Sequence, residues 1–341
     1  MTHASLADQA VADRSDSASE YTLSPHEIHQ VALVVERLRS RVSEVDRPET
    51  VTAAQLLHGH LPEGLLRALE HFRRYGNPDG ALTIRNLPLP DDLPPTPRAV
   101  NSVAVECTPS AALLLLLMSR MGDAISYAEE KHGALIHDIC PIPGEEDQQQ
   151  NTGAVYFKLH TENAFHVNRP DFLGLLCLRP DHDMRAASIT SSISRAVRLL
   201  DPVDDAVLRQ PRFRTRLAPS FCRGQASRPY LDPAPVLAGS PAHPLLTVDF
   251  DDTAPCDPQA EAALNALHTA LHAVRREAVL LTGDLVIIDN STTVHGRSEF
   301  TPRYDGADRW LQRMFVVRSL RNALDLLEPA GGYRCRALAV P

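Results

Sequence analysis

The sequence lacks the features that mark several common classes of protein. Its six cysteines are scattered through 341 residues without a Cys-x-x-Cys pair, which is typical of reduced thiols in a cytoplasmic protein. Basic residues do not cluster with aromatics and the formal net charge is −9, which argues against nucleic acid or an anionic membrane as partner. The most apolar run, residues 111–118, is too short to span a bilayer. No charged segment followed by an apolar one opens the chain, so we expect a cytoplasmic protein.

The remaining pattern indicates an α+β protein. Residues 1–20 are small and polar and predict a disordered leader, which leaves 21–341 as a single domain. Helices are expected over 24–42, about 62–75, 108–122 and about 259–277, whereas strands dominate from about residue 124 onward. The segment over about 212–243 is rich in proline, arginine and glycine and is long enough to cover a site. Helices first and strands later favour an antiparallel sandwich or barrel as the core.

A histidine and a glutamate stand two residues apart in a predicted strand over 154–162. His160 and Glu162 are expected to project from one face of that strand, together with Tyr156 and Lys158. Two such neighbours can supply adjacent ligands to a divalent metal. The pair alone is weak evidence, because an ordinary ion pair on a strand uses the same residues.

A second group of residues near the end of the chain strengthens the metal hypothesis. His295 follows an apolar strand over 285–288, and Arg309 lies fourteen residues beyond His295. Two histidines and one carboxylate with open coordination positions form the facial triad of non-haem Fe(II) oxygenases. A guanidinium group matches a carboxylate as a bidentate fork, so Arg309 suits the distal carboxylate of a dicarboxylate cosubstrate.

Together with four longer segments, this set resembles the clavaminate synthase-like group of Fe(II)/2-oxoglutarate oxygenases. Within that group it is most similar to the hydroxylases of free arginine, lysine or asparagine. The segments are GALIHDICPIPG, LHTENAFHVNRPDFLGLLCLRP, GDLVIIDN and VHGRSEFTPRYDGADRWLQR. The resemblance implies a double-stranded β-helix, or jelly roll, over about 122–320 with flanking helices. Residues 21–341 would then form one oxygenase domain, with 212–243 as a lid-like insertion.

The resemblance also implies roles for individual residues, with O2 as the second cosubstrate. The ligands of Fe(II) would be His160, Glu162 and His295. Arg309 would bind the far carboxylate of 2-oxoglutarate, assisted by the hydroxyl of Ser188 or Thr190, and Arg313 would bind the α-carboxylate of the amino-acid substrate. Because residue 162 is a glutamate, no coordination position is free for chloride, which disfavours a halogenase.

The acidic residues indicate a basic amino acid as the small-molecule substrate. Asp249 and Asp251 are expected on one face of the predicted strand LLTVDFD, where the resemblance places acids that bind a cationic side chain. The resemblance also implies a position near the α-ammonium group for Glu129 and Glu130. Carboxylates beside a pocket are unfavourable unless they meet a cation. Free L-lysine is therefore the first choice and an L-arginine-like molecule the second. Hydroxylation at C3 or C4 would give the hydroxy-amino acid, succinate and CO2.

Two functions from other classes use the same residues. A non-oxygenase metal-dependent enzyme on a jelly roll has no need of Arg309, and a non-catalytic binding protein on the same fold has no need of an intact triad. Both are therefore disfavoured. The sequence leaves the oligomeric state open, a homo-oligomer included.

Overall fold

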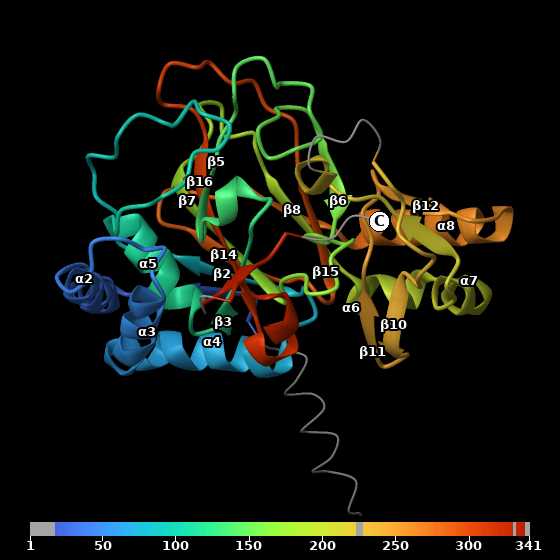
Figure 1. The fold of residues 1–341 in the computed structure, drawn as a ribbon, viewed down its shortest axis with the longest axis horizontal. Helices are drawn as coiled ribbons and strands as arrows, with labels where there is room; N and C mark the ends of the chain where they lie inside the picture. The colour runs from blue at the N-terminus through green and yellow to red at the C-terminus, as the bar shows by residue number, and fades with distance from the viewer. Residues whose placement is uncertain (1–17, 223–227, 330–331, 338–341) are drawn as a thin grey trace, which may run out of the picture.

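Two β-sheets form the core of the protein, whose computed structural model describes residues 18–222, 228–329 and 332–337 (Figure 1). The larger sheet has the strand order β1–β2–β14–β7–β16–β3, and β5 also pairs with β16. Its central pairs are antiparallel. The strands are β1 (Glu20–Thr22), β2 (Ala81–Arg85), β3 (Asp123–Ala124), β5 (Ile136–Ile139), β7 (Phe172–Arg179), β14 (Leu285–Asp289) and β16 (Trp310–Val317).

The smaller sheet carries both histidines of the predicted metal site. It is antiparallel with the order β13–β8–β15–β6. Its strands are β6 (Phe157–His160), β8 (Ser188–Ser192), β13 (Arg276–Ala278) and β15 (Thr293–Arg297). The register pairs His295 of β15 with His160 of β6 on one side and with Thr190 of β8 on the other. This pairing brings two segments that are far apart in the sequence to one point.

Four helices cover the outer face of the larger sheet: α2 (Pro25–Arg39), α3 (Pro48–Leu57), α4 (Glu63–Tyr75) and α5 (Pro109–Met118). A capping box begins α2: the Ser24 side chain accepts from the backbone N–H of Glu27, and the Glu27 side chain accepts from the backbone N–H of Ser24. Every residue of α5 after Pro109 is buried, and the helix packs on β7 and β16. One apolar cluster joins these helices to sheet residues such as Ile84, Leu285 and Met314.

The outer face of the smaller sheet is covered by α6 (Ile193–Ala196), α7 (Pro202–Leu208) and α8 (Pro258–Val274). Buried side chains of α8, such as Leu267 and Leu271, belong to one cluster with Ile189 and Val294 of the sheet. Because strand side chains alternate between faces, the neighbours Ser188, Thr190 and His295 are directed to the opposite, inner face. On the face of the larger sheet away from its helices, a further apolar cluster includes Leu173, Ile288 and Phe315. The polar residues of the smaller sheet's inner face therefore lie beside apolar packing.

Shorter elements complete the described structure. Three strand pairs lie outside the main sheets: β4 (Ser126–Tyr127) with β17 (Arg334–Cys335), β9 (Phe213–Thr215) with β12 (Thr253–Pro255), and β10 (Leu237–Ser240) with β11 (His243–Leu246). Single 3-10 turns occupy His58–His60, Lys131–Gly133, Val197–Leu199, Pro219–Cys222, Leu320–Asn322 and Leu324–Leu326. In the described part of the chain no helix is long and apolar enough to cross a membrane.

The jelly-roll class expected from the sequence is confirmed, with several local differences. The first helix ends at Arg39 rather than at residue 42, and α3 was not predicted. The predicted strand LLTVDFD is wrong in its second half: β11 ends at Leu246, and Asp249 to Asp252 form a turn. The expected leader falls largely on residues 1–17, which lie outside the described residues, whereas Glu20 already belongs to β1.

Candidate active site

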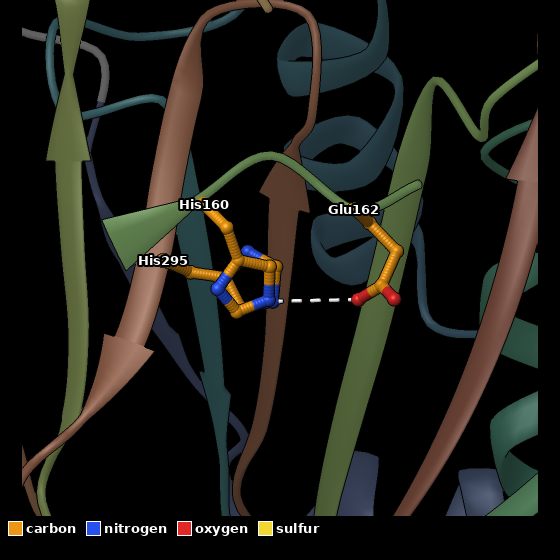
Figure 2. Close-up of side chains that lie close together, drawn as sticks. All are labelled: His160, Glu162 and His295. Atoms are coloured by element: carbon orange, nitrogen blue, oxygen red, sulfur yellow. Dashed lines mark ion pairs between the residues drawn. The ribbon is translucent and has the colours of Figure 1, made fainter. Parts of the chain in front are cut away.

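His160, Glu162 and His295 lie together at one end of the smaller sheet (Figure 2). The rings of the two histidines are 4.3 Å apart between centroids, and Nε2 of His295 is 3.4 Å from Oε2 of Glu162. Their ligand atoms all lie within 4.8 Å of one another, and all three residues are buried. Glu162 reaches this point differently from the prediction: β6 ends at His160, so the carboxylate comes from the turn that follows rather than from the strand face.

Local hydrogen bonds prepare these side chains for a metal. Nδ1 of His160 lies 2.8 Å from the carbonyl oxygen of Lys158, to which it donates its proton, so Nε2 is left unprotonated as a ligand. The oxygen Oε2 of Glu162 is buried and accepts no hydrogen bond from the described residues. An orphaned buried carboxylate oxygen is unfavourable unless a cation meets it. Two imidazoles and a carboxylate around that atom therefore fit a divalent iron site with open positions.

Asn290, at the end of β14, fixes the turn that carries Glu162. Its side-chain oxygen accepts from the backbone N–H of Glu162 at 2.7 Å, and its amide nitrogen donates to the carbonyl oxygens of Glu162 at 3.0 Å and Pro170 at 2.8 Å. Asn290 is fully buried. The segment GDLVIIDN was noticed in the sequence, but its final asparagine gave no sign of this role, because its partners are more than a hundred residues away.

The electrostatics of the site keep the ligands in the forms that a metal requires. Burial alone would raise the pKa of Glu162, but the charge of Arg313 and the contact with His295 outweigh it and hold that pKa well below its usual range. Burial, reinforced by His160, lowers the pKa of His295 to about 4. At neutral pH the carboxylate is therefore charged and this imidazole is neutral.

Arg313 on β16 connects the larger sheet to the predicted iron ligands. Its Nη1 lies 3.1 Å from Oε1 of Glu162, and its Nη2 contacts both Glu130 and, at 3.0 Å, Nδ1 of His137. The guanidinium also stacks on the ring of Phe315 at 4.4 Å. Arg313 is 2% exposed, and burial raises the pKa of Glu130 despite the opposing charge of Arg313. The contact between Arg313 and Glu162 shows that the two sheets face each other across the site.

Arg309, directly before β16, is buried and has no ion-pair partner among the described residues. It is 5% exposed, and in the described part of the chain it makes neither an ion pair nor a side-chain hydrogen bond. Burial lowers the pKa of its guanidinium, which otherwise stays protonated. A buried guanidinium is unfavourable until an anion pairs with it, so Arg309 fits the distal carboxylate of 2-oxoglutarate.

The two hydroxyl candidates lie on β8, next to β15. Ser188 pairs in register with Arg297, and Thr190 pairs with His295. Arg297 itself was not singled out in the sequence, although it ends the segment VHGR. It is 4% exposed, and burial, with the charge of Arg309 acting in the same direction, lowers its pKa to about 9.

The predicted substrate acids do not all reach the site. A cavity of about 220 Å³ beside the ligands is lined by Glu129, Glu130, Asp249 and Arg313 together with the amide residues Gln149, Gln150, Asn151 and Asn163. Asp251 is not among its lining residues: it pairs with Lys158 at 2.6 Å on the protein surface. The prediction that Asp249 and Asp251 share a strand face is therefore wrong. The carboxylate of Asp249 instead accepts the backbone N–H of Asp251 at 2.8 Å, which closes a turn.

Comparison with known proteins agrees with this geometry. Residues 219–315 match the family model described as taurine catabolism dioxygenase TauD, TfdA family. L-asparagine oxygenase of Streptomyces coelicolor is 42% identical over 334 residues, which cover 97% of this chain and 99% of the relative. L-lysine 3-hydroxylase of Catenulispora acidiphila is 35% identical over 270 residues, or 77% of this chain and 74% of the relative. The chain belongs to the TauD/TfdA family of Fe(II)/2-oxoglutarate-dependent oxygenases.

A solved structure gives the same result in three dimensions. Asparagine oxygenase in complex with Fe(II), (2S,3S)-3-hydroxyasparagine and succinate superposes with a TM-score of 0.90 at 42% identity, over 94% of this chain and 100% of the other. The chain is thus a dioxygenase that hydroxylates a free amino acid with Fe(II), 2-oxoglutarate and O2. This confirms the oxygenase interpretation over the two alternative functions. The preference for lysine is not confirmed.

Proposed function

We propose that this oxygenase hydroxylates free L-asparagine at C3. The observation that carries the proposal is the position of Asp249, which lines the cavity, whereas Asp251, the other acid predicted to meet the substrate side chain, does not. Its Oδ1 is occupied by the N–H groups of Asp251 and Asp252, at 2.8 Å and 3.3 Å. In the described structure no hydrogen bond reaches Oδ2, which is therefore available to the NH2 group of a substrate amide.

The rest of the cavity supports a short, neutral side chain. Asp252 also lines it, but Arg228 and Arg216 already pair with this carboxylate, so it adds little negative charge. Gln150 and Asn151 offer amide N–H groups that can donate to the substrate's amide oxygen. The cavity of about 220 Å³ is also smaller than the range of about 300–1,000 Å³ typical of ligand pockets, which favours a compact amino acid.

The α-carboxylate and the α-ammonium group of the amino acid would have partners on another wall of the cavity than Asp249. Arg313 would bind the α-carboxylate, and Glu130 would accept from the α-ammonium group; both line the cavity and contact each other. Glu129 lies in the same wall. With the α-groups held there and the amide held by Asp249, the carbon between them lies beside the metal ligands. This arrangement supports C3 as the position of hydroxylation.

The remaining residues would hold the groups that react with that carbon. His160, Glu162 and His295 would bind Fe(II), which with 2-oxoglutarate and O2 supplies the oxidising power that replaces C–H by C–OH and yields succinate and CO2. Arg309 would hold the distal carboxylate of 2-oxoglutarate, and Ser188 or Thr190 would donate to it. The buried position of all three ligands keeps bulk water away from this reaction.

A competition experiment tests the substrate. The purified enzyme is incubated with Fe(II), 2-oxoglutarate, O2 and an equimolar mixture of asparagine, aspartate, glutamine, lysine and arginine, and the products are separated by mass spectrometry. We expect a gain of one oxygen on asparagine first. Hydroxylation of glutamine or of aspartate ahead of asparagine would contradict the proposal.

A basic amino acid is the second candidate, supported by the 35% identity to L-lysine 3-hydroxylase and by the carboxylates of Asp249 and Asp252 in the cavity. The same mixture separates the two candidates, because a single carboxylate that binds an ammonium group strongly would favour lysine over its neutral competitors. Preferred hydroxylation of lysine or arginine would replace asparagine by this second assignment.

A further inference from the structure

Arg297 occupies an unusual position for an arginine. It is the last residue of β15, two residues after His295, so the two side chains project from the same face of the strand. That face is directed to the space between the sheets, where His295 meets His160 and Glu162. Only 4% of Arg297 is exposed. A guanidinium group is rarely buried to this extent without a paired acid.

The contacts of Arg297 hold its side chain but do not neutralise its charge. Its Nη2 donates to the carbonyl oxygen of Val155 at 2.9 Å, and the guanidinium lies 5.0 Å from the ring centre of Phe300. Its Nε is buried and has no hydrogen-bond partner in the described part of the chain. No carboxylate there forms an ion pair with it. A neutral carbonyl and a ring face leave most of the cost of burying this cation uncompensated.

Arg309, next to a strand of the larger sheet, is also a buried guanidinium group without an ion-pair partner in the described structure. It directly precedes β16. Arg313, four residues after Arg309, contacts Glu162 at 3.1 Å, and Glu162 lies 3.4 Å from His295, two residues before Arg297. Arg309 and Arg297 therefore stand on opposite sides of the same space between the sheets. Two unpaired cations that converge from opposite sheets, with Ser188 beside Arg297 in the register, form a place for an anion.

We propose that Arg297 is a second binding residue for 2-oxoglutarate, and that it donates to the distal carboxylate from the smaller sheet while Arg309 donates from the larger sheet. The inference rests on the proposed role of Arg309 and extends it. It also accounts for the orphaned Nε of Arg297, which the fold alone leaves without a partner.

A comparison of two ligands tests this role without any turnover. 2-Oxobutyrate keeps the 2-oxo acid end of 2-oxoglutarate but lacks the distal carboxylate. Both are titrated by calorimetry into the Zn(II)-loaded full-length protein, in the wild type and in Arg297→Gln, Arg297→Lys and Arg309→Gln. Arg303→Gln is the matched control. Arg303 lies in the loop between β15 and β16, but it is exposed and pairs with Asp183 at 2.9 Å.

In Arg297→Gln we expect the Kd for 2-oxoglutarate to rise about tenfold or more, and that for 2-oxobutyrate less than about twofold, as for the loss of a charge-assisted hydrogen bond. Arg297→Lys keeps the charge without the fork and should reduce the preference for 2-oxoglutarate by a smaller factor, about threefold. If Arg297→Gln does not fold, the ligand preference of Arg297→Lys alone shows whether Arg297 binds the distal carboxylate. Arg303→Gln should leave both constants unchanged.

Three outcomes would overturn the inference or its basis. Equal weakening of both ligands in the Arg297 variants would assign Arg297 a structural role through Val155 and Phe300. An unchanged preference for 2-oxoglutarate in both Arg297 variants would remove it from the site. If Arg309→Gln also kept the full preference for 2-oxoglutarate over 2-oxobutyrate, the proposed cosubstrate site itself would be wrong, whatever the Arg297 variants do.

Discussion

At the scale of single residues, His295 is the most informative of the predicted iron ligands, because it alone comes from a distant part of the chain. We expect His295→Ala to weaken Fe(II) binding by more than about 100-fold, since even changes in residues that support a metal ligand cost 10–100-fold. Hydroxylation should disappear with it. The fold should persist, because β15 keeps its pairing with β6 and β8. Equilibrium dialysis with iron analysis, together with circular dichroism, measures both effects.

Iron binding near the wild-type level in His295→Ala would refute the ligand assignment. The exposed His26 on α2 supplies a matched control, since His26→Ala removes an imidazole far from the cavity lining. Its iron affinity should equal that of the wild type.

In the proposed function, the carboxylate of Asp249 is the side-chain group that selects asparagine as the substrate. Asp249→Asn keeps one oxygen for the N–H groups of Asp251 and Asp252 and replaces the other oxygen by NH2. The NH2 group of a substrate asparagine then loses its acceptor. We expect kcat/KM for asparagine to fall by about 30-fold, or roughly 2 kcal/mol, as for one side of a desolvated polar pair. Activity on aspartate should rise relative to asparagine, because the carboxylate of the cavity no longer repels it.

The surface acid Asp251 provides the control for that experiment. Asp251→Asn removes a carboxylate two residues away that pairs with Lys158 outside the cavity. Its substrate preference should match that of the wild type. If Asp251→Asn changed the preference as much as Asp249→Asn, long-range charge rather than contact with the substrate would be responsible.

At the scale of secondary-structure elements, the end of β14 supports the turn that carries Glu162. Asn290→Ala would leave the backbone N–H and C=O of Glu162 without their partners in a buried place. We expect the free energy of unfolding to fall by about 2–4 kcal/mol and the Fe(II) affinity to fall by 10–100-fold. Urea unfolding and iron titration give the two quantities separately.

Partial rescue distinguishes positioning from general stability. Asn290→Asp keeps the acceptor for the N–H of Glu162 but loses both donors. It should bind iron better than Asn290→Ala does, and the exposed Asn265→Ala on α8 should behave like the wild type. A loss of stability in Asn290→Ala without any loss of iron affinity would show that Asn290 supports the fold and not the site.

The same elements show which parts of the site a sequence can predict. The sequence could predict His160, Glu162, His295 and Arg309 because their chemistry and spacing are visible in short segments, and the structure brings the first three together. Their roles toward iron and 2-oxoglutarate stay predictions. Asp251 was misplaced because alternation of residues does not reveal where a strand ends, and here the side chain of Asp249 closes a turn. The roles of Asn290 and Arg297 depend on partners from distant strands and loops, so no local pattern could predict them.

At the scale of the whole molecule, the space between the two sheets contains more charge than a protein interior usually does. Glu130, Glu162 and Arg313 form a connected network there, while Arg297 and Arg309 form no ion pair in the described structure. Each buried charge lowers the stability of the protein alone unless it is paired. Bound Fe(II) and 2-oxoglutarate would supply the opposite charges that these buried groups lack. The stability of the fold and the occupancy of the site are therefore linked.

The pH dependence of global stability offers a test that is separate from the metal. His166 is buried, its Nδ1 accepts the backbone N–H of Asn168 at 3.0 Å, and the ring of Tyr127 meets it at 4.7 Å between centroids. Burial lowers the pKa of His166 to about 4 in the folded protein. In the unfolded chain the pKa is about 6.5. As the pH falls below 6.5, His166 binds a proton in the unfolded chain but stays neutral in the folded protein. The free energy of unfolding therefore falls between pH 6.5 and pH 4 and not above that range.

The contribution of His166 is isolated by comparison with a side chain that does not titrate. From the two pKa values, the wild type should lose about 2 kcal/mol more unfolding free energy between pH 7 and pH 5 than His166→Gln does. Urea unfolding of the metal-free proteins in the presence of a chelator measures this difference, because contributions from the other histidines cancel between the two proteins. Between pH 8 and pH 7 the two should change by the same amount. Parallel losses from pH 7 to pH 5 would mean that His166 is protonated in the folded state as readily as in the unfolded chain, and its buried hydrogen bond with Asn168 would then not survive in solution.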